Sequence, residues 1–337
     1  MEKIVYCEFE FLKEFLNSRP VANMDPEAIN PVNSWNKLYC FIRKSKTYLN
    51  VPKEVFFKAA LDNKLLLSFA KDSTFIFEPD KFPDIRNLDE SALNNDILNS
   101  VFLTKMNKIE RQNKAQELGI IVLGIQDVNK FESLFSEVEI AIKKGESISW
   151  ETLLHHEYIP ISNSMIIVDN YILKDITNLR NLLDVILPQR LNTVYNLSIY
   201  ALNKTIVENT IYNRIIPEIE SLRKGKLNVK IVVCSTSTND FHDRVIISNN
   251  TWIDCSGGFD LLKKDSASNK RTVLRIAFPF ILNPSSKKSW ENESYMYLLE
   301  DLWYIEKPGR DHKLNFDYWG NQSRDNRLIK YYMGKNI

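Results

Sequence analysis

Glycine and proline are scarce in this 337-residue sequence, and long hydrophobic runs are absent. The chain has only 9 Gly and 12 Pro, too few for a collagen-like or low-complexity protein. Nowhere do about 18 apolar residues follow one another, so no membrane-spanning helix is predicted. Because 44% of the residues are hydrophobic and 26% are charged, the composition is instead that of an ordinary globular protein with a sizeable core.

An excess of charge of either sign is also lacking. Lys and Arg together number 44, Asp and Glu 43, and the formal net charge is +1. Such a chain has no overall electric field that would draw it onto a polyanion, so any phosphate binding must depend on a local group of charges. The sequence starts with MEKIVYCEFEFLKEF, in which acidic residues stand where a signal peptide has an apolar stretch. We therefore expect a cytoplasmic protein.

Cysteine usage argues against a disulfide framework and against a zinc site. The four cysteines are far apart in the sequence, show no CxxC spacing and have apolar neighbours: Cys7, Cys40, Cys234 and Cys255. They are predicted to be reduced thiols in the core.

Alternating strand and helix patterns predict two mixed α/β domains, in line with roughly 150 residues per domain. In the first half, residues 3–7 and 47–51 are β-rich runs that each precede a helical pattern. A strand at 100–104, a helix at 107–118 with Gly119 as its stop, and a strand at 120–123 then form a strand-helix-strand unit. The first domain is predicted to span residues 1–150, with a linker at 143–150.

The second half repeats this alternation of strands and helices. Strands are predicted at 164–169, 197–201 and 230–234, and helices at 178–187 and 207–222. This order favours a sheet covered by helices. We assign a second domain to residues 155–305 and a basic, aromatic C-terminal tail to 306–337.

The stretch from Asp240 to Leu262 carries the residues best suited to chemistry. His242 and Arg244 alternate along a predicted strand, so an imidazole and a fixed cation share one face. After a turn at 249–250 and a second strand, Ser256-Gly257-Gly258 forms a bend whose backbone N–H groups could approach a bound anion. The pattern predicts a phosphate site that consists of Arg244, Ser256, Gly257 and Gly258.

This spacing resembles one half-site of the phospholipase D superfamily. The superfamily pattern is His-x-Lys, four residues, Asp, six residues, and a Gly-Gly or Gly-Ser pair followed shortly by Asn. Here His242 takes the nucleophile position, Arg244 that of the lysine, Asn249 that of the aspartate, and Asp260 follows the glycines. The spacing matches without a gap, whereas three polar identities differ.

A closer resemblance is to the phospholipase D-like domain at the C-terminus of MIT-domain proteins and in their prokaryotic relatives. That domain has a strand ending in Asp-x-Tyr, a helix rich in Asn and Leu, and a His-Asp-Arg motif that leads through a Trp to a Gly-rich Leu/Phe-Asp. The matching segments are Asp169-Asn170-Tyr171, residues 178–187, His242-Asp243-Arg244, Trp252 and Gly258-Phe259-Asp260. The resemblance covers about residues 160–305.

The resemblance implies a catalytic function for His242, Arg244, Asn249 and Asp260. In a reaction of this type one imidazole attacks phosphorus, a second protonates the leaving oxygen and cations hold the other oxygens, without a metal cofactor. Since the sequence has one such motif, activity would require a homodimer in which two half-sites meet. The expected function is that of a phosphodiesterase or nuclease acting on nucleic acid, for example in a prokaryotic defence system.

Two other interpretations stay open. The MIT-linked relatives are regarded as lipid-binding modules, and Asn249 cannot stabilise an imidazolium as a carboxylate would. The domain would then be a non-catalytic sensor of phosphate groups or of an anionic membrane surface. In the remaining interpretation, His242 and Arg244 only hydrogen-bond neighbouring loops.

The N-terminal half resembles PIN-like nuclease domains. Residues 100–128 match the closing strand-helix-strand unit of that family, with Ala-x-x-x-Gly at the end of the helix. Glu8 and Glu54 stand where the family keeps its first two acidic residues, which implies Mg²⁺ or Mn²⁺ binding for phosphodiester cleavage. A Thr-Lys-Met-Asn run stands where Thr-x-Asp is usual. The alternative is an inactive α/β domain in which Glu8 and Glu54 are solvated.

Overall fold

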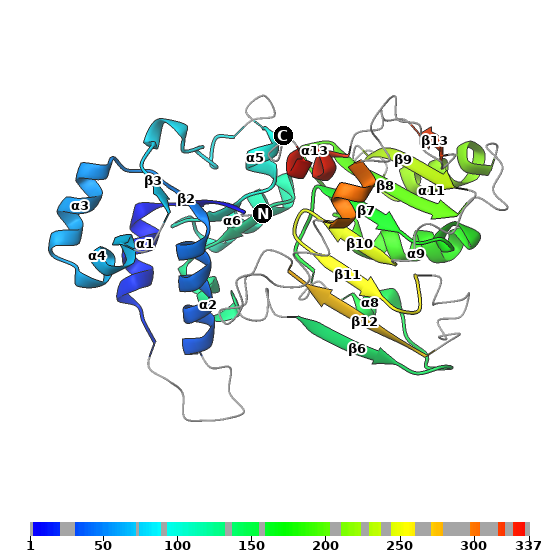
Figure 1. The fold of residues 1–337 in the computed structure, drawn as a ribbon, viewed down its shortest axis with the longest axis horizontal. Coiled ribbons are helices and arrows are strands. Elements are labelled where there is room, and N and C mark those ends of the chain that lie inside the picture. The colour runs from blue at the N-terminus through cyan, green and yellow to red at the C-terminus, as the bar shows by residue number, and fades with distance from the viewer. Residues whose placement is uncertain are drawn as a thin grey trace. The chain divides into compact units, whose positions relative to one another are not determined.

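The computed structural model shows a mixed α/β protein with two sheets, so the predicted mixed α/β class is confirmed (Figure 1). It describes residues 3–20, 31–71, 74–88, 93–131, 137–154, 159–202, 210–223, 229–236, 244–259, 271–278, 297–303, 316–320 and 326–333. The chain forms two compact units, the first of residues 1–136 with 280–289 and the second of 137–279 with 290–337. Among the described helices, none has both the length and the apolar character that crossing a membrane requires.

The first unit contains a five-stranded sheet in which all neighbours are parallel, in the order β3-β2-β1-β4-β5. Its strands are β1 (Ile4–Cys7), β2 (Lys46–Leu49), β3 (Phe75–Ile76), β4 (Val101–Leu103) and β5 (Ile121–Leu123). Its helices are α1 (Phe9–Asn17), α2 (Pro31–Lys44), α3 (Lys53–Leu61), α4 (Lys64–Lys71), α5 (Asn95–Leu98) and α6 (Lys108–Leu118), with 3₁₀ turns η1 (Pro79–Lys81) and η3 (Ile125–Lys130). The central strands β1 and β4 are buried throughout, as expected when helices cover both faces of a parallel sheet.

Helix α6 begins and ends where its sequence predicts. Asn107 is the N-cap: its side chain accepts from the Glu110 N–H, and the Glu110 carboxylate accepts from the Asn107 N–H, which forms a capping box. At the other end, Gly119 adopts a left-handed conformation with φ of 63°, which favours glycine. These two local signals explain why the strand-helix-strand unit could be predicted from its sequence.

An ion pair joins α6 to the turn after β5. The Arg111 side chain is 2% exposed, and its Nε donates to Asp127 Oδ2 over 3.0 Å. The same carboxylate oxygen accepts from the Gly124 N–H over 2.9 Å. A Cβ atom at Gly124 would lie 2.3 Å from Arg111 Cζ, so Gly124 is required for close packing against the guanidinium.

The second unit contains an eight-stranded mixed sheet in the order β13-β9-β8-β7-β10-β11-β12-β6. The strands β7, β8 and β9 are parallel to one another, and the other neighbours are antiparallel. The strands are β6 (Val138–Ile142), β7 (Ser164–Val168), β8 (Tyr195–Leu202), β9 (Val229–Thr236), β10 (Val245–Ser248), β11 (Trp252–Cys255), β12 (Thr272–Ala277) and β13 (Phe316–Gly320). The helices are α8 (Trp150–Leu153), η4 (Ile172–Lys174), α9 (Ile176–Ile186), the π-helix η5 (Ile211–Ile215), α11 (Ile216–Ser221) and α13 (Arg327–Met333).

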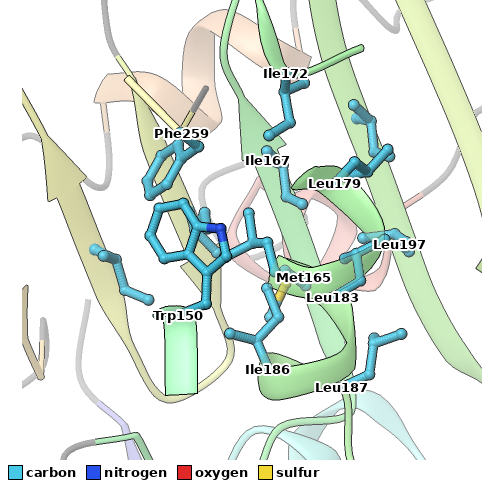
Figure 2. Close-up of a cluster of buried hydrophobic side chains, with 14 of the residues drawn as sticks. Trp150, Met165, Ile167, Ile172, Leu179, Leu183, Ile186, Leu187, Leu197 and Phe259 are labelled. Carbon is cyan, nitrogen blue, oxygen red and sulfur yellow. The ribbon is translucent and has the colours of Figure 1, made fainter. Parts of the chain in front are cut away.

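Helix α9 provides much of the core on one face of this sheet. Its buried residues Leu179, Leu182, Leu183 and Ile186 follow the spacing of one helix face, and they pack with alternate residues of β7 and β8. Figure 2 shows Trp150 of α8 in this cluster, beside Phe259 and near the α9 side chains. Burial of each such large apolar side chain stabilises the fold by roughly 1.5–3 kcal/mol.

The observed units differ from the predicted domains at both ends of the second one. Residues 138–142, which the sequence analysis placed in the first domain, form β6 and pair with β12. Residues predicted to form a separate tail contribute β13, which pairs with β9, and α13, which packs on β7. In α13, Arg327 donates to Asn163 and Val194 oxygens, and its burial lowers its pKa to about 10. The C-terminal segment is therefore part of the second unit.

The cysteines described in full agree with the predicted thiols. Cys7 and Cys255 are buried, Cys40 is partly exposed, and all three are free. Burial, together with the Glu8 charge, raises the pKa of Cys7 well above its ordinary value. The side chain of Cys234 lies outside the described residues.

We predict that Asp127→Ala lowers the free energy of unfolding of the first unit by about 3 kcal/mol, because it leaves the buried Arg111 charge without its partner. This value is at the low end for broken buried pairs, since the Asp127 side chain is 24% exposed. Urea denaturation followed by tryptophan fluorescence measures the loss. The control Glu117→Ala removes the partly exposed pair with Lys114 and should cost less than about 1 kcal/mol. Equal losses in the two variants would contradict this role of Asp127.

Candidate functional site

Several chain segments meet at the carboxyl end of β7. Parallel β8 lies on one side of β7, and antiparallel β10 lies on the other. Val245, the first residue of β10, is paired with Val168 of β7 and with Asp254 of β11. After β7 the chain forms β8 on one side of this strand, and it later returns to form β10 on the other side. In open α/β sheets, ligands bind at the carboxyl ends of strands where the order reverses in this way.

Asp169 follows β7 directly and is fully buried. One carboxylate oxygen accepts from the Tyr171 N–H over 2.7 Å, and the other accepts from the Phe259 N–H over 2.5 Å. Hydrogen bonds to an ionised acceptor are stronger than neutral ones. Asp169 therefore fixes the turn after β7 and the loop of residues 256–259 relative to each other.

A second connection to this loop comes from helix α9. The Asn178 side-chain amide donates to the Phe259 carbonyl over 2.5 Å, and its oxygen accepts from the Trp150 indole N–H over 2.9 Å. Phe259 is thus held through both its N–H and its C=O, and its ring is buried. The end of the loop is anchored in the core that Figure 2 shows.

Three backbone N–H groups of loop 256–259 are engaged within the fold. Ser256 N donates to the Val273 carbonyl over 3.2 Å, Gly258 N donates to the Cys255 carbonyl over 2.9 Å, and Phe259 N donates to Asp169. Gly258 has φ of 86°, which explains the glycine. The sequence predicts that Ser256, Gly257 and Gly258 direct N–H groups at an anion, whereas the N–H groups of Ser256 and Gly258 stabilise the bend itself.

Arg244 lies beside this bend at the start of β10. Its NH1 donates to the Ser256 carbonyl over 2.9 Å, so the predicted phosphate residues Arg244 and Ser256 are in contact. The Arg244 guanidinium carbon lies 5.9 Å from the centre of the Tyr171 ring. Lys174 Nζ lies 4.0 Å from the same ring centre. Two cations and an aromatic ring therefore gather at the carboxyl end of β7, and we call Tyr171, Lys174 and Arg244 the cationic triad.

The triad residues are accessible to a ligand. Lys174 is exposed, and Tyr171 and Arg244 are partly exposed. Within the described part of the chain, neither Lys174 nor Arg244 forms a salt bridge with a carboxylate. Among the described residues, an anion that enters from solvent would therefore meet two cations that form no salt bridge.

Cys255 lies under the loop, where it is not suited to act as a nucleophile. Its thiol donates to the Gly258 carbonyl over 3.2 Å. Burial is the main cause that raises its pKa to about 11, and the Asp169 charge adds to the effect. At neutral pH this side chain is a thiol, which is a poor nucleophile and a poor metal ligand.

Of the four predicted catalytic residues, Arg244 and Asn249 are described, and the structure separates them. Asn249 follows β10 at its other end, so the four residues of this strand lie between them, at roughly 3.3 Å per residue. Asn249 is fully buried, and its side-chain oxygen accepts from the Asn163 N–H over 3.0 Å. It joins two loops and does not reach the cationic triad. His242 and Asp260 lie outside the described residues.

The predicted metal residues of the first unit are Glu8 and Glu54. Glu8 follows β1 and is 8% exposed, so it is not solvated as the inactive alternative supposed. One of its oxygens accepts from the Lys105 N–H over 2.7 Å, and the other pairs with Arg86 over 2.9 Å. Glu54 is exposed on α3. In the described residues, no three His, Cys, Asp or Glu side chains gather in a way that could hold a metal ion.

No protein-family model matches the chain, and no curated protein sequence is significantly similar to it. A function can therefore be inferred only from the residues of the site and their geometry.

The sequence analysis missed Lys174 and considered Tyr171 only as part of a motif. Both residues could have been predicted as site residues from their position shortly after Asp169, because residues that follow a parallel strand lie at the edge where ligands bind. That position could not show which cation lies near Arg244, since the two segments are far apart in the chain.

We predict that Asp169→Asn releases the loop, since an amide offers one oxygen acceptor to two N–H donors. The expected cost is about 1–3 kcal/mol of unfolding free energy, with faster hydrogen exchange at the amides of Tyr171 and Phe259. Denaturant titration and exchange mass spectrometry measure these effects. The control Asp175→Asn keeps a side-chain oxygen at the N-cap of α9, where Asp and Asn are equivalent, and should change neither quantity. Unchanged exchange at Phe259 in Asp169→Asn would show that the carboxylate does not hold the loop.

Proposed function

We propose that the second unit binds phosphate groups of nucleic acid at the cationic triad. The observation that carries this proposal is the placement of Lys174 and Arg244 around one tyrosine ring at the carboxyl end of β7. The resemblance of residues 160–305 to phospholipase D-like domains supports the same chemistry, because Arg244 occupies the position of a phosphate-binding lysine.

The three side chains have complementary roles in this proposal. Arg244 offers a planar fork of N–H donors, of which one NH1 donor is bonded to the Ser256 carbonyl and others face the ring of Tyr171 and the solvent. Lys174 supplies a point charge with three donors. The Tyr171 hydroxyl can donate one further hydrogen bond. Asp169 positions this group, since it holds the backbone of Tyr171 and the loop beneath Arg244.

We predict that Arg244→Gln weakens binding of a 5′-phosphorylated single-stranded oligonucleotide with a 3′-fluorescein label about tenfold or more, as expected for loss of a charge-assisted contact. Lys174→Gln should weaken binding too and reduce the slope of log affinity against log salt by about one. Fluorescence anisotropy at several salt concentrations measures both effects.

The matched control is Arg180→Gln on helix α9, where the guanidinium is already paired with Glu218. This change alters the net charge of the second unit as Arg244→Gln does, but leaves the triad intact. Binding should remain within about twofold of the wild-type value. Equal weakening of oligonucleotide binding in Arg180→Gln and Arg244→Gln would mean that binding follows net charge alone. Tighter binding to acidic liposomes than to the oligonucleotide would indicate a membrane ligand. Either result would refute the proposal.

A second candidate function is hydrolysis of the bound phosphodiester by His242. The observation that favours it is the position of Arg244, which reaches the site from the start of β10, two residues after His242. On an extended chain, alternate residues point to the same face. His242 would attack phosphorus while Arg244 holds a non-bridging oxygen, and the imidazole of a second chain would protonate the leaving oxygen.

For this candidate we predict a homodimer in sedimentation experiments and cleavage of an oligonucleotide that persists in EDTA. His242→Ala should abolish cleavage and leave binding within a few fold, because the phosphate contacts are made by the triad. Cleavage that EDTA stops would assign the activity to a metal site instead. A monomer that binds but does not cleave would leave the binding function alone.

A further inference from the structure

We propose that the cationic triad selects a terminal phosphate, a phosphomonoester at the end of a nucleic acid strand, over an internal phosphodiester. This inference deepens the proposed function and rests on it. The triad has two cations, and the two types of phosphate group differ in negative charge and in free oxygens.

Both cations of the triad contact one ring. Lys174 Nζ is 4.0 Å from the Tyr171 ring centre, and the Arg244 guanidinium carbon is 5.9 Å from it. Each distance is within the range of a cation–π contact, which keeps the cations close without neutralising them. Both cations therefore lie beside the same partly exposed ring, and in this proposal a phosphate bound there pairs with both of them.

Two carboxylates of the described residues next to the triad accept hydrogen bonds from backbone N–H groups. Asp169 is fully buried and accepts from Tyr171 N and Phe259 N. Asp175 follows Lys174, and its carboxylate accepts from Thr177 N and Asn178 N at the start of α9. Asp169 is thereby held inside the fold and Asp175 at the partly exposed start of α9, and N–H dipoles offset part of their charge. Neither of these two described carboxylates forms a salt bridge with Lys174 or Arg244.

The two kinds of phosphate differ in charge and in free oxygens. An internal phosphodiester carries one negative charge on two non-bridging oxygens. A phosphomonoester has a second pKa of about 6, so it carries nearly two charges at neutral pH, and three oxygens accept hydrogen bonds. A dianion can pair with Lys174 and Arg244 simultaneously, whereas a monoanion satisfies one of them. Lys174 is therefore the residue that determines specificity, and Arg244 binds both types of ligand.

The described loop beside the triad offers few contacts to a neighbouring sugar or base. In the described loop, the N–H groups of Ser256, Gly258 and Phe259 are engaged, and Ser256 Oγ bonds with Thr272 Oγ1 over 3.0 Å and accepts from Val273 N over 3.2 Å. In this proposal, recognition depends on the phosphate itself. Discrimination between the end and the interior of a strand then follows from charge.

The test compares two single-stranded oligonucleotides of one sequence, one with a 5′-phosphate and one with a 5′-hydroxyl, each labelled at the 3′ end. Anisotropy titrations with the full chain should show about tenfold tighter binding of the phosphorylated strand, the factor that one additional charge-assisted contact contributes. Methyl phosphate should compete with the phosphorylated strand at lower concentration than dimethyl phosphate.

Variants of the triad separate the role of each residue. Lys174→Gln should reduce the preference for the phosphorylated strand to about twofold and leave the weaker binding of the hydroxyl strand nearly unchanged. Lys174→Arg should restore the preference, which a merely structural lysine would not require. Tyr171→Phe keeps the aromatic ring that both cations contact and should retain the preference. Tyr171→Leu removes the ring and should lose the preference.

The outcomes distinguish this inference from the proposed function. If both strands bind equally and Arg244→Gln weakens both, nucleic-acid binding stands and selection of the end is wrong. If Lys174→Gln weakens both strands by the same factor, Lys174 is a general phosphate contact and the inference is likewise overturned. If neither strand binds, the proposed function itself fails.

Discussion

The second unit depends on one buried carboxylate for the arrangement of its candidate site. Asp169 accepts hydrogen bonds from the turn that follows β7 and from the loop that follows β11. A buried charge is costly without compensation, and here two backbone N–H groups provide it. Because these donors come from segments that are far apart in the chain, the carboxylate is satisfied only when both segments are in place. The position of Tyr171 beside Arg244 is a consequence of this constraint.

The first unit has a comparable carboxylate with a different environment. Glu8 follows β1 at the position in its sheet where the strand order reverses, with β2 on one side and β4 on the other. Its oxygens accept from the Lys105 N–H and from Arg86, so Glu8 is engaged by a cation of the chain itself. A carboxylate paired with a guanidinium is a weaker metal ligand than a free one. The chain thus has two sheets with an acid after a central strand, and in both of them the acid holds structure.

Helix ends could be predicted from the sequence where the hydrogen bonds that define them join residues close together in the chain. Asn107 and Gly119 marked the ends of α6 because a capping box and a left-handed glycine involve only neighbouring residues. The apolar spacing of α9 predicted its buried face for the same reason. The Ser256-Gly257-Gly258 bend was also located correctly, but the use of its N–H groups was not. The Ser256 and Gly258 donors are bonded to the carbonyls of Val273 and Cys255, and a motif of a few residues holds no information about a partner as distant as Val273.

The sequence by itself determined the mixed α/β class of the fold, the positions of most strands and of several helices, among them α6 and α9, and the presence of an arginine at the start of β10. Only the tertiary structure decided that 138–142 and 316–320 belong to the second sheet, that Asn249 lies away from Arg244, and that Lys174 lies near it. The physical reason is the range of the interactions. Periodicity and capping act over one or two turns of chain, whereas a site is formed by strand order and register, which bring distant segments to a common edge.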